Sequence, residues 1–306
     1  APRSSSPRRC WPRRSGCVWS VWALDKKRFG IQALAALLQN ANLKGFFTGK
    51  IYQGPLKSVC VPGLNCYSCP GAVGACPIGS LQSFLSGLRV RIPYYIVGLL
   101  LFFGAVLGRA VCGFLCPFGF LQELLNKIPG VPKRDHFRLD RPLRRLKYAV
   151  LVLLVVVLPL LYPLTPFFCK YHCPSGTLAG ILLAARDSMV RAQLGGIFLW
   201  KFFVLLWVAA ACLVIYRPFC KYLCPLGAIY GLFNRFALYR THLDADRCIH
   251  CGACAKACRM CVDPSKTPNS AECIRCGDCA RACPAGALHM GLRRKSKESS
   301  EPITRS

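Results

Sequence analysis

Eight cysteines near the C-terminus repeat one spacing, Cys-x2-Cys-x2-Cys-x3-Cys, twice, and this pattern constrains the local fold more than any other feature of the chain. A 4Fe-4S cubane needs four thiolates. A tight x2 loop wraps three of them around one cluster, while the fourth cysteine ligates a second cluster. The spacing therefore predicts two cluster sites. The first would use Cys248, Cys251, Cys254 and Cys283, and the second Cys273, Cys276, Cys279 and Cys258.

Zinc is the simpler alternative for a cysteine-rich segment. Structural zinc sites use two Cys-x2-Cys knuckles separated by a dozen or more residues. A third cysteine two residues after the second does not fit a knuckle, and it occurs in both copies, so the pattern favours iron–sulfur clusters. The first copy departs from the usual form, because Arg259 rather than proline follows Cys258. Cys261 is either a spare ligand or, as we expect, an unligated thiol.

Apolar residues make up 54% of the chain, whose mean hydropathy is +0.36, and they are concentrated in long stretches. Residues 92–111, 146–168 and 195–216 are each about 20 residues long and nearly free of charge, a length that suits a hydrocarbon core about 30 Å thick. Arg109 and Lys201 are the exceptions. Both lie near the end of a stretch, where a long side chain can reach the membrane interface.

Two weaker apolar segments accompany these three. Residues 29–47 are interrupted by glutamines and asparagines, and we expect a fourth span there, with an interfacial helix as the alternative. Residues 177–185 are too short to cross a membrane and are followed by charged residues. An interfacial or re-entrant helix is expected for that segment.

The expected fold is an α-helical integral membrane protein of about four spans, followed by a C-terminal α+β domain of the bacterial double 4Fe-4S ferredoxin type. The predicted boundaries are a basic, disordered tail at 1–28, the membrane domain at 29–240, the ferredoxin domain at 241–290 and a polar, disordered tail at 291–306. The first residues lack an apolar h-region, so we do not expect them to form a signal peptide.

The formal net charge of +29 raises the question of a nucleic-acid partner. The positive charge is spread over the tail and the loops between apolar stretches, and no recognition motif accompanies it, so nucleic acid is not expected. Basic loops of this kind meet anionic lipid headgroups. The positive-inside rule predicts that the N-terminus, the loop at 112–147 and the ferredoxin domain lie in the cytoplasm.

A second motif occurs in two matched copies within the apolar part of the chain. Arg109 and Arg217 each precede Cys-x3-Cys-Pro-x-Gly, an apolar helix start and an Asn-basic pair. One pair of cysteines cannot saturate a cubane but two pairs can, so we predict that the pairs meet around one shared cluster. The alternative is that they are small buried residues at helix ends. The pairs are Cys112 with Cys116 and Cys220 with Cys224.

Six more cysteines are expected on the opposite, outer face of the membrane, where a further cluster is predicted. Structural disulfides are the rival interpretation, because an exported face is oxidising. Spacing does not decide which four would ligate. The six are Cys60, Cys66, Cys69, Cys76, Cys169 and Cys173. The remaining cysteines are expected to be structural or incidental, and these are Cys10, Cys17, Cys212 and Cys261.

Other catalytic chemistry finds little support in the sequence. All five histidines lie outside the apolar stretches, so no pair within the membrane would ligate a haem. No Rossmann glycine pattern, P-loop, nucleophile elbow or acid/base carboxylate pair is present. With only 12 Asp and Glu residues, substrate chemistry by the side chains themselves is not expected.

Over roughly residues 29–290, the chain resembles the membrane polyferredoxins of the NapH/NosR type. The resemblance rests on the paired segments Cys-Gly-Phe-Leu-Cys-Pro-Phe-Gly and Cys-Lys-Tyr-Leu-Cys-Pro-Leu-Gly between expected spans, followed by a double ferredoxin. It implies a multi-pass electron-transfer protein of the bacterial cytoplasmic (inner) membrane, with the ferredoxin on the cytoplasmic side. Such a protein would support anaerobic respiratory reductases, taking electrons from quinol or passing them across the membrane. We expect no external flavin-binding domain, in contrast to the NosR-like members, and the chain carries extra cysteines at 60–76, so the resemblance leaves the pathway open.

We therefore expect an electron carrier that relays electrons between a cytoplasmic donor or the quinol pool and a partner reductase or exported redox protein. A flavoprotein or small redox carrier is an expected partner. One difficulty is that the membrane faces lie about 30 Å apart, so the clusters must sit deep or a quinone or partner must bridge them. The alternatives are a redox-sensing or maturation factor for a membrane or exported metalloprotein, and the electron-input subunit of a larger enzyme.

Overall fold

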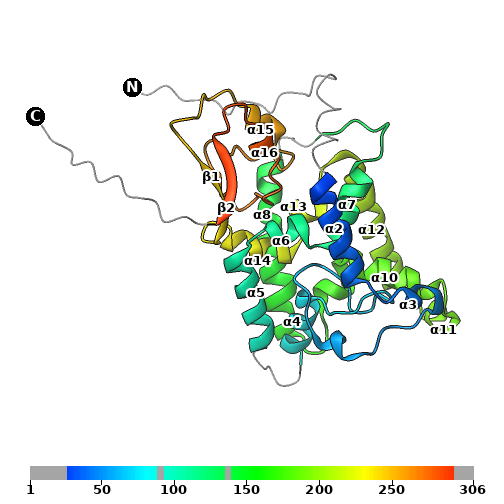
Figure 1. Ribbon diagram of the computed structural model, residues 1–306. Helices are drawn as coiled ribbons and strands as arrows, with labels where there is room; N and C mark the ends of the chain where they lie inside the picture. The colour runs from blue at the N-terminus through cyan, green and yellow to red at the C-terminus, as the bar shows by residue number, and fades with distance from the viewer. Residues whose placement is uncertain (1–25, 88–92, 135–138, 293–306) are drawn as a thin grey trace, which may run out of the picture.

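The computed structural model describes residues 26–87, 93–134 and 139–292, and Figure 1 traces the chain through them. Most of the predicted tails at 1–28 and 291–306 therefore lies outside the described residues, as do Cys10 and Cys17. The helical elements in chain order are α2 (Lys26–Gln39), α3 (Leu43–Thr48), the 3-10 helix η1 (Pro55–Ser58), α4 (Pro77–Leu85), α5 (Tyr94–Val106), α6 (Ala110–Phe114), α7 (Pro117–Asn126), α8 (Asp140–Val150), the π-helix η2 (Leu151–Val157), α9 (Leu158–Leu161), the π-helix η3 (Phe168–His172), α10 (Pro174–Ala184), α11 (Ser188–Ala192), α12 (Gly196–Val214), α13 (Pro218–Tyr222) and α14 (Pro225–Phe233).

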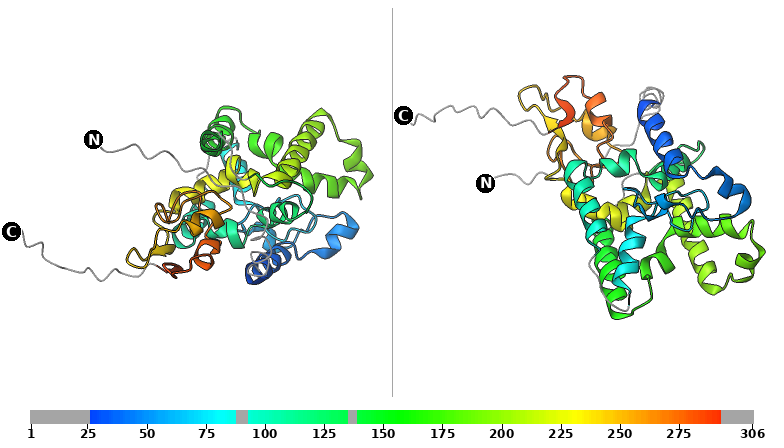
Figure 2. Two further views of the ribbon diagram at one scale, coloured as in Figure 1. Left: turned by 90° about the horizontal axis from the view of Figure 1, so that it is seen from above. Right: turned by 60° about the horizontal axis from the view of Figure 1, so that its bottom comes forward.

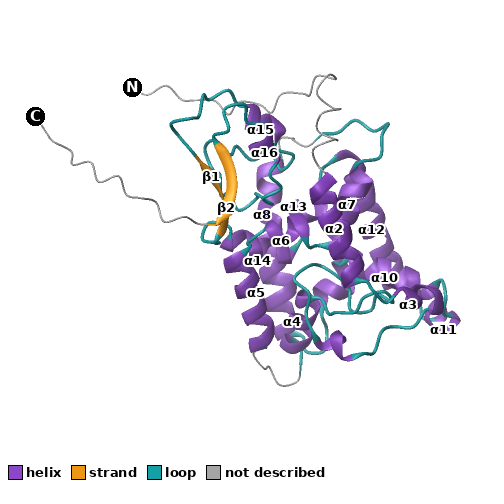
Figure 3. Ribbon diagram, in the orientation of Figure 1, coloured by secondary structure: helices purple, strands orange, loops and turns teal. Residues whose placement is uncertain are grey.

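A small C-terminal unit lies against one end of the helices, close to α8 and α14 (Figure 1, Figure 2). It contains the two strands of the described chain (Figure 3). Strand β1 (Tyr239–Leu243) pairs antiparallel with β2 (Leu288–Leu292), with Thr241 opposite Met290. The short helices α15 (Ala253–Ala257) and α16 (Asp278–Arg281) lie in the loops between the strands. This α+β unit carries all eight cysteines of the double ferredoxin pattern.

Among the described residues, only α12 is both long and apolar enough to cross a membrane. The sequence led us to expect more. The stretch at 92–111 forms α5, which has 13 residues and ends before a turn at Gly108, where φ is +54°. The stretch at 146–168 continues α8 through η2 to Leu161. Pro163 then disfavours helical geometry at the residue before it, so the helix stops.

The segment 29–47 is not one continuous span, contrary to our expectation. Helix α2 ends at Gln39, and α3 starts at Leu43. Two asparagines lie in the break. The Asn40 side chain donates to the Ala36 carbonyl, and the Asn42 side chain donates to the Pro70 carbonyl at 2.8 Å. Side chains that bond to nearby backbone compete with helix continuation, which explains why the helix is interrupted here.

Large apolar side chains cover much of the outside of the helical unit. They occur on α2, α5, η2 and α12, and only 11% of the α12 apolar window is buried. Examples from three of these helices are Leu34, Leu37, Leu101, Phe102, Phe203, Leu206 and Trp207. An apolar surface of this extent is unusual for a soluble monomer and marks a site of interaction.

Cysteines form an unusual share of the core of the helical unit. Its buried cluster includes Cys60, Cys76, Cys112, Cys116, Cys173, Cys212 and Cys224. Helices α4, α7, α10 and α14 each begin directly after a cysteine, with proline as the first helical residue. Proline suits that position because the first N–H of a helix needs no partner within it and the ring presets φ. The four helix starts therefore direct four cysteines into the core.

Candidate iron–sulfur sites

The eight C-terminal cysteines line two separate pockets. Cys248, Cys251, Cys254 and Cys283 line one, which we call the first ferredoxin pocket. Cys258, Cys273, Cys276 and Cys279 line the other, the second ferredoxin pocket. These are the two sets that the spacing predicts. The fourth cysteine of each run thus lies with the first three of the other run.

Matched backbone geometry shapes the loop at each ferredoxin pocket. His250 and Arg275, each just before the second cysteine of its run, adopt positive φ values of 52° and 55°. Gly252 and Gly277, just after that cysteine, have φ values of 72° and 83°. Positive φ is rare for residues other than glycine, so two such residues around each cysteine curl the chain tightly. The tight curl is what lets three closely spaced cysteines line one pocket.

The two ferredoxin pockets differ in their exposure. Cys251 of the first pocket is exposed, and its neighbour Ile249 is 66% exposed. In the second pocket, burial together with nearby cysteines raises the pKa of the Cys258 and Cys279 thiols to about 12. Cys258 and Cys276 also pack on a small core formed by Tyr216, Met260, Val262 and Ile274. The first pocket thus faces solvent, and the second faces the helical unit.

Four cysteines from the matched motifs meet inside the helical unit. We call them the inner quartet, and they are Cys112, Cys116, Cys220 and Cys224, each no more than 6% exposed. Burial raises the pKa of Cys116 to about 12, with further contributions from Cys220 and Cys112. The structure therefore brings together the set predicted to share a cluster.

Backbone and side-chain donors point at the inner quartet sulfurs. The N–H of Gly119 donates to Cys116 Sγ, and that of Gly227 donates to Cys224 Sγ, both at 3.4 Å. Gln122 Nε2 lies 3.1 Å from Cys220 Sγ. Hydrogen bonds to the sulfurs are one of the means by which proteins tune iron–sulfur clusters. The second cysteine, proline and glycine of each motif thus build a ligand together with a donor to it.

Each of the two arginines that precede the motifs donates a hydrogen bond to the other motif. Arg109 Nη2 donates to the Cys220 carbonyl at 3.0 Å, and Arg217 Nη1 donates to the Cys112 carbonyl. Arg109 is fully buried, so our expectation that it reaches a membrane interface was wrong. The sequence shows that both motifs are preceded by an arginine, but not that each arginine bonds to the other motif.

Two buried glutamates balance these arginines, and the sequence did not reveal them. Glu123 pairs with Arg217 and Arg28 at 3.2 and 2.7 Å, while Glu272 pairs with Arg109 at 2.8 Å. Burial alone would raise the pKa of both carboxyl groups, but their cationic partners hold it below the ordinary value. The sequence offered one signal that could have identified these glutamates, namely that acidic residues are rare in a chain with so many cationic ones.

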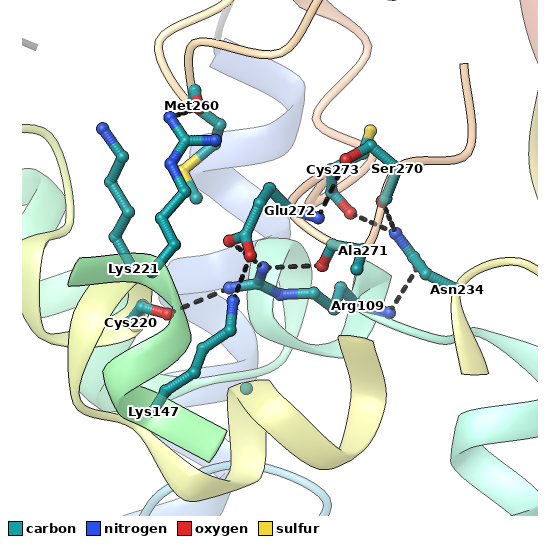
Figure 4. Close-up of polar contacts among 12 residues, drawn as sticks. Arg109, Lys147, Cys220, Lys221, Asn234, Met260, Ser270, Ala271, Glu272 and Cys273 are labelled. Atoms are coloured by element: carbon teal, nitrogen blue, oxygen red, sulfur yellow. Dashed lines mark hydrogen bonds and ion pairs between the residues drawn. The ribbon is translucent and has the colours of Figure 1, made fainter. Parts of the chain in front are cut away.

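The loop of the second ferredoxin pocket is held against the inner quartet, as Figure 4 shows. Asn234 Nδ2 donates to the carbonyls of Ser270 and Cys273, at 2.6 and 2.8 Å. A Cβ atom built on Gly113, the residue after Cys112, would lie 2.4 Å from the Ile274 carbonyl oxygen. Glycine is therefore required for this close approach. Residues 270–276 thus pack directly on the helix that carries Cys112.

The six cysteines predicted on the outer face separate into four that converge and two that do not. Cys66, Cys76, Cys169 and Cys173 lie between the starts of α4 and α10, and we call them the distal quartet. Cys60 instead donates to Ser80 Oγ at 3.5 Å, and Cys69 lies 3.9 Å from Asn40 Oδ1. All described cysteines are free, so no disulfide is found among them.

The sulfur donors suit iron–sulfur clusters. The described residues contain no group of three or more Cys, His, Asp or Glu side chains that could hold a single metal ion. A cubane places its own iron and sulfide atoms between the thiolates, so it needs a wider arrangement of sulfurs than one zinc ion does. Because a thiol must lose its proton to become a ligand, loading a cluster onto these cysteines would release protons.

Comparison with known families supports the same chemistry. A family described as 4Fe-4S binding domain matches residues 74–95, 92–135, 147–187 and 197–243. Each of these four segments contains one Cys-Pro-x-Gly sequence. Two further families of that description match residues 239–260 and 267–289, at the two ferredoxin runs. No solved structure matches the chain.

Several curated proteins are similar in sequence. The chain is 30% identical over 257 residues to the methylamine utilization ferredoxin-type protein MauN of Paracoccus denitrificans, which covers 83% of this chain and 81% of MauN. It is 30% identical over 195 residues to the uncharacterized protein MJ0749 of Methanocaldococcus jannaschii, covering 60% of this chain and 64% of that protein. Identity to the regulatory protein NosR of Stutzerimonas stutzeri is 29% over 166 residues, but the chain spans only 20% of NosR.

The paired Cys-Pro-x-Gly segments and the C-terminal ferredoxin unit together define an iron–sulfur protein. The chain belongs to the polyferredoxin family of 4Fe-4S binding proteins.

Proposed function

We propose that this chain is a membrane-bound electron carrier, which relays electrons between a cytoplasmic donor or the quinol pool and a partner reductase or exported redox protein. Iron–sulfur clusters supply one-electron chemistry when bound. The inner quartet and the ferredoxin cysteines would hold them. The ferredoxin-type name of the MauN relative agrees with this role.

The contact between the second ferredoxin pocket and the inner quartet is the observation that carries the proposal. Ile274, next to Cys273, touches Gly113, next to Cys112, and Arg109 links the two regions through Glu272. Arg275 also donates to the Leu107 carbonyl at 2.8 Å. A soluble ferredoxin tethered by a linker would not need this fixed docking. The first pocket, exposed at Cys251, then offers the surface at which a flavoprotein or small redox carrier would exchange electrons.

Membrane attachment rests on the exposed apolar helices. A core helix of a soluble protein would be mostly buried, whereas only 11% of the α12 apolar window is buried. Helices α2, α5 and η2 also expose large apolar side chains, which supports a multi-pass arrangement with lipid around the helical unit. The chain should therefore stay in the membrane fraction after an alkaline carbonate wash. Release by the wash would contradict this part of the proposal.

The number of clusters tests the carrier role. Full-length protein purified without oxygen should contain at least three clusters' worth of iron and sulfide, and EPR with redox titration should order their potentials. Cys112→Ser should remove one signal. Cys261→Ser is the matched control, because Cys261 contributes to neither ferredoxin pocket, and it should keep the wild-type iron content. Fewer than three clusters in the wild-type chain would contradict the proposal.

A redox-sensing or maturation factor is the second candidate, and the name of the regulatory protein NosR favours it. In that role Cys66, Cys69 and the cysteines near them would act as free thiols on a client protein. Labelling of Cys66 and Cys69 by a membrane-impermeant thiol reagent on intact cells would support this candidate over the electron carrier. Protection of Cys66 from the reagent would favour the carrier.

A further inference from the structure

We propose that Cys66, Cys76, Cys169 and Cys173 ligate a further 4Fe-4S cluster, and that Cys60 and Cys69 do not. This inference deepens the proposed function and rests on it, because it assigns the ligands of one more site in the same relay. Spacing alone left six candidates. Three observations select these four residues.

The first observation is the shared plan of the four helix starts. Cys76, Cys116, Cys173 and Cys224 each form the N-cap of a helix that continues Pro-x-Gly. Cys112, Cys169 and Cys220 lie four positions earlier in their copies. In the copy that ends at Cys76 this position is Ala72, so that copy lacks its first cysteine. A sulfur from elsewhere must complete the set.

The second observation is that Cys66 occupies the missing place. A Cβ atom built on Gly176 would lie 3.8 Å from the Sγ atoms of both Cys66 and Cys173. A Cβ atom built on Gly79 would lie 3.8 Å from Cys169 Sγ and from Cys76 Cβ. Gly176 therefore lies close to Cys66, and Gly79 lies close to Cys169, so each glycine is near a quartet cysteine from outside its own copy.

The third observation is a glutamine that links the copies in the same way at both quartets. Gln122, six residues after Cys116, accepts a hydrogen bond from the Phe219 N–H at 3.1 Å. Gln82, six residues after Cys76, accepts one from the Cys169 N–H at 3.2 Å. Both side chains are almost fully buried. The copies at Cys76 and Cys169 therefore pack as a pair, as do those at Cys116 and Cys220.

Electrostatic contacts agree with this selection. Burial raises the pKa of Cys169 well above its ordinary value, with further contributions from Cys173, Cys76 and Cys66. Burial also raises the pKa of Cys60, but no other cysteine contributes there. Cys69 contributes to the pKa shift of Cys66, whereas burial and other residues make the largest contributions at Cys76, Cys169 and Cys173. The two excluded cysteines thus lie at the edge of the group or outside it.

Lys201 supplies a positive charge to this site. Its Nζ would lie 3.7 Å from a Cβ atom built on Gly176, the same point that both Cys66 and Cys173 approach. A lysine in the apolar helix α12 is costly unless it has a partner. Four thiolates and a cluster core carry net negative charge, and cluster charge and surroundings set the reduction potential. Lys201 would therefore raise the potential of this cluster.

The distal quartet is also close to the inner quartet. The N–H of Leu64, two residues before Cys66, lies 3.5 Å from Cys116 Sγ. The Tyr230 hydroxyl, on the helix that starts after Cys224, donates to the Pro62 carbonyl at 3.0 Å. The loop that carries Cys66 therefore touches the inner quartet directly.

Single serine variants in the full-length chain, purified without oxygen, test the assignment. Cys66→Ser and Cys169→Ser should each lose about four iron and four sulfide per chain, the content of one cubane, together with one EPR signal. Cys60→Ser and Cys69→Ser, the matched controls, should keep the wild-type content. Loss of a cluster in either control, or full content in Cys66→Ser, would overturn the proposal.

Lys201→Met provides a second measurement that does not require loss of the cluster. It should lower the midpoint potential of one EPR signal, the one missing in Cys66→Ser, and leave the others unchanged. An unchanged midpoint, or a shift of a different signal, would count against the site. A wild-type chain with only the two ferredoxin clusters and the inner cluster would overturn this inference and leave the carrier role intact. Fewer than three clusters would contradict both.

Discussion

The ferredoxin pockets and the inner quartet use the same residue type but assemble it differently. Each ferredoxin pocket takes three of its cysteines from one short loop, at 248–254 or 273–279. The inner quartet takes two cysteines from each of two motifs, at 112–116 and 220–224, that meet only when the helices pack. The first geometry is set by the local backbone, and the second by the whole helical core. A substitution in a ferredoxin loop should therefore affect mainly the cluster of that loop. A substitution in the inner quartet should also destabilise the packing of the helical unit.

Ligand variants should show this contrast most strongly. Cys224→Ser should lose about four iron per chain and also lower the apparent melting temperature of the helical unit, because Cys224 is buried at its centre. Cys251→Ser should lose a similar amount of iron with little effect on melting, since Cys251 is exposed. Iron analysis and circular dichroism on detergent-purified protein measure both. Equal destabilisation by the two variants would remove the distinction between local and global assembly.

Glu272→Gln should have the next largest effect. It leaves the fully buried Arg109 and Lys147 without their carboxylate, and breaking a buried ion pair in this way costs about 3–5 kcal/mol. Asp244→Asn is the control, because its partner Arg247 is 71% exposed and surface pairs contribute at most about 1 kcal/mol. Thermal unfolding of both variants gives the comparison. A small effect of Glu272→Gln would mean that docking of the ferredoxin unit does not depend on this charge.

Gly113→Ala should disturb the contact between the two regions sterically. The added Cβ would meet the Ile274 carbonyl, and overpacking of this kind costs about 1–3 kcal/mol. Gly98→Ala in α5 is the control, since a Cβ there meets nothing within 4 Å. Hydrogen exchange of residues 270–276 should accelerate in Gly113→Ala alone. Unchanged exchange would show that the loop tolerates a wider separation.

The smallest effect is expected when Asn234→Ala is compared with Asn126→Ala. The two asparagines occupy the same position in the two motifs. Asn126 donates to the Cys212 carbonyl within the helical unit, whereas Asn234 accepts from the Arg109 N–H and also donates to the Ser270 and Cys273 carbonyls of the ferredoxin loop. Each lost hydrogen bond is worth about 1 kcal/mol. Only Asn234→Ala should shift the EPR signal of the second ferredoxin pocket, and a shift in both variants would contradict this role.

Local spacing and repetition allowed much of the candidate site to be predicted from the sequence. The x2 spacing predicts which three closely spaced cysteines line each ferredoxin pocket, because the geometry of a short loop depends on neighbouring residues. The repeated motif likewise predicted that Cys112, Cys116, Cys220 and Cys224 meet. Hydropathy was less successful, since asparagines and prolines interrupt the helices at Asn40 and Pro163. Selection of Cys66 over Cys69 depends on packing between distant segments, which spacing cannot show.

The crossed arginines have a consequence for how the chain is divided. Arg109 serves the Cys220 copy and Arg217 serves the Cys112 copy. Reciprocal contacts of this kind characterise isologous dimer interfaces, in which residue i contacts j and j contacts i. Here both partners belong to one polypeptide, so the helical unit behaves as a covalently joined dimer. Neither copy contains a complete inner quartet, and a cut between the two copies would leave each fragment with two of its four cysteines and with a buried arginine that has lost its partner in the other fragment.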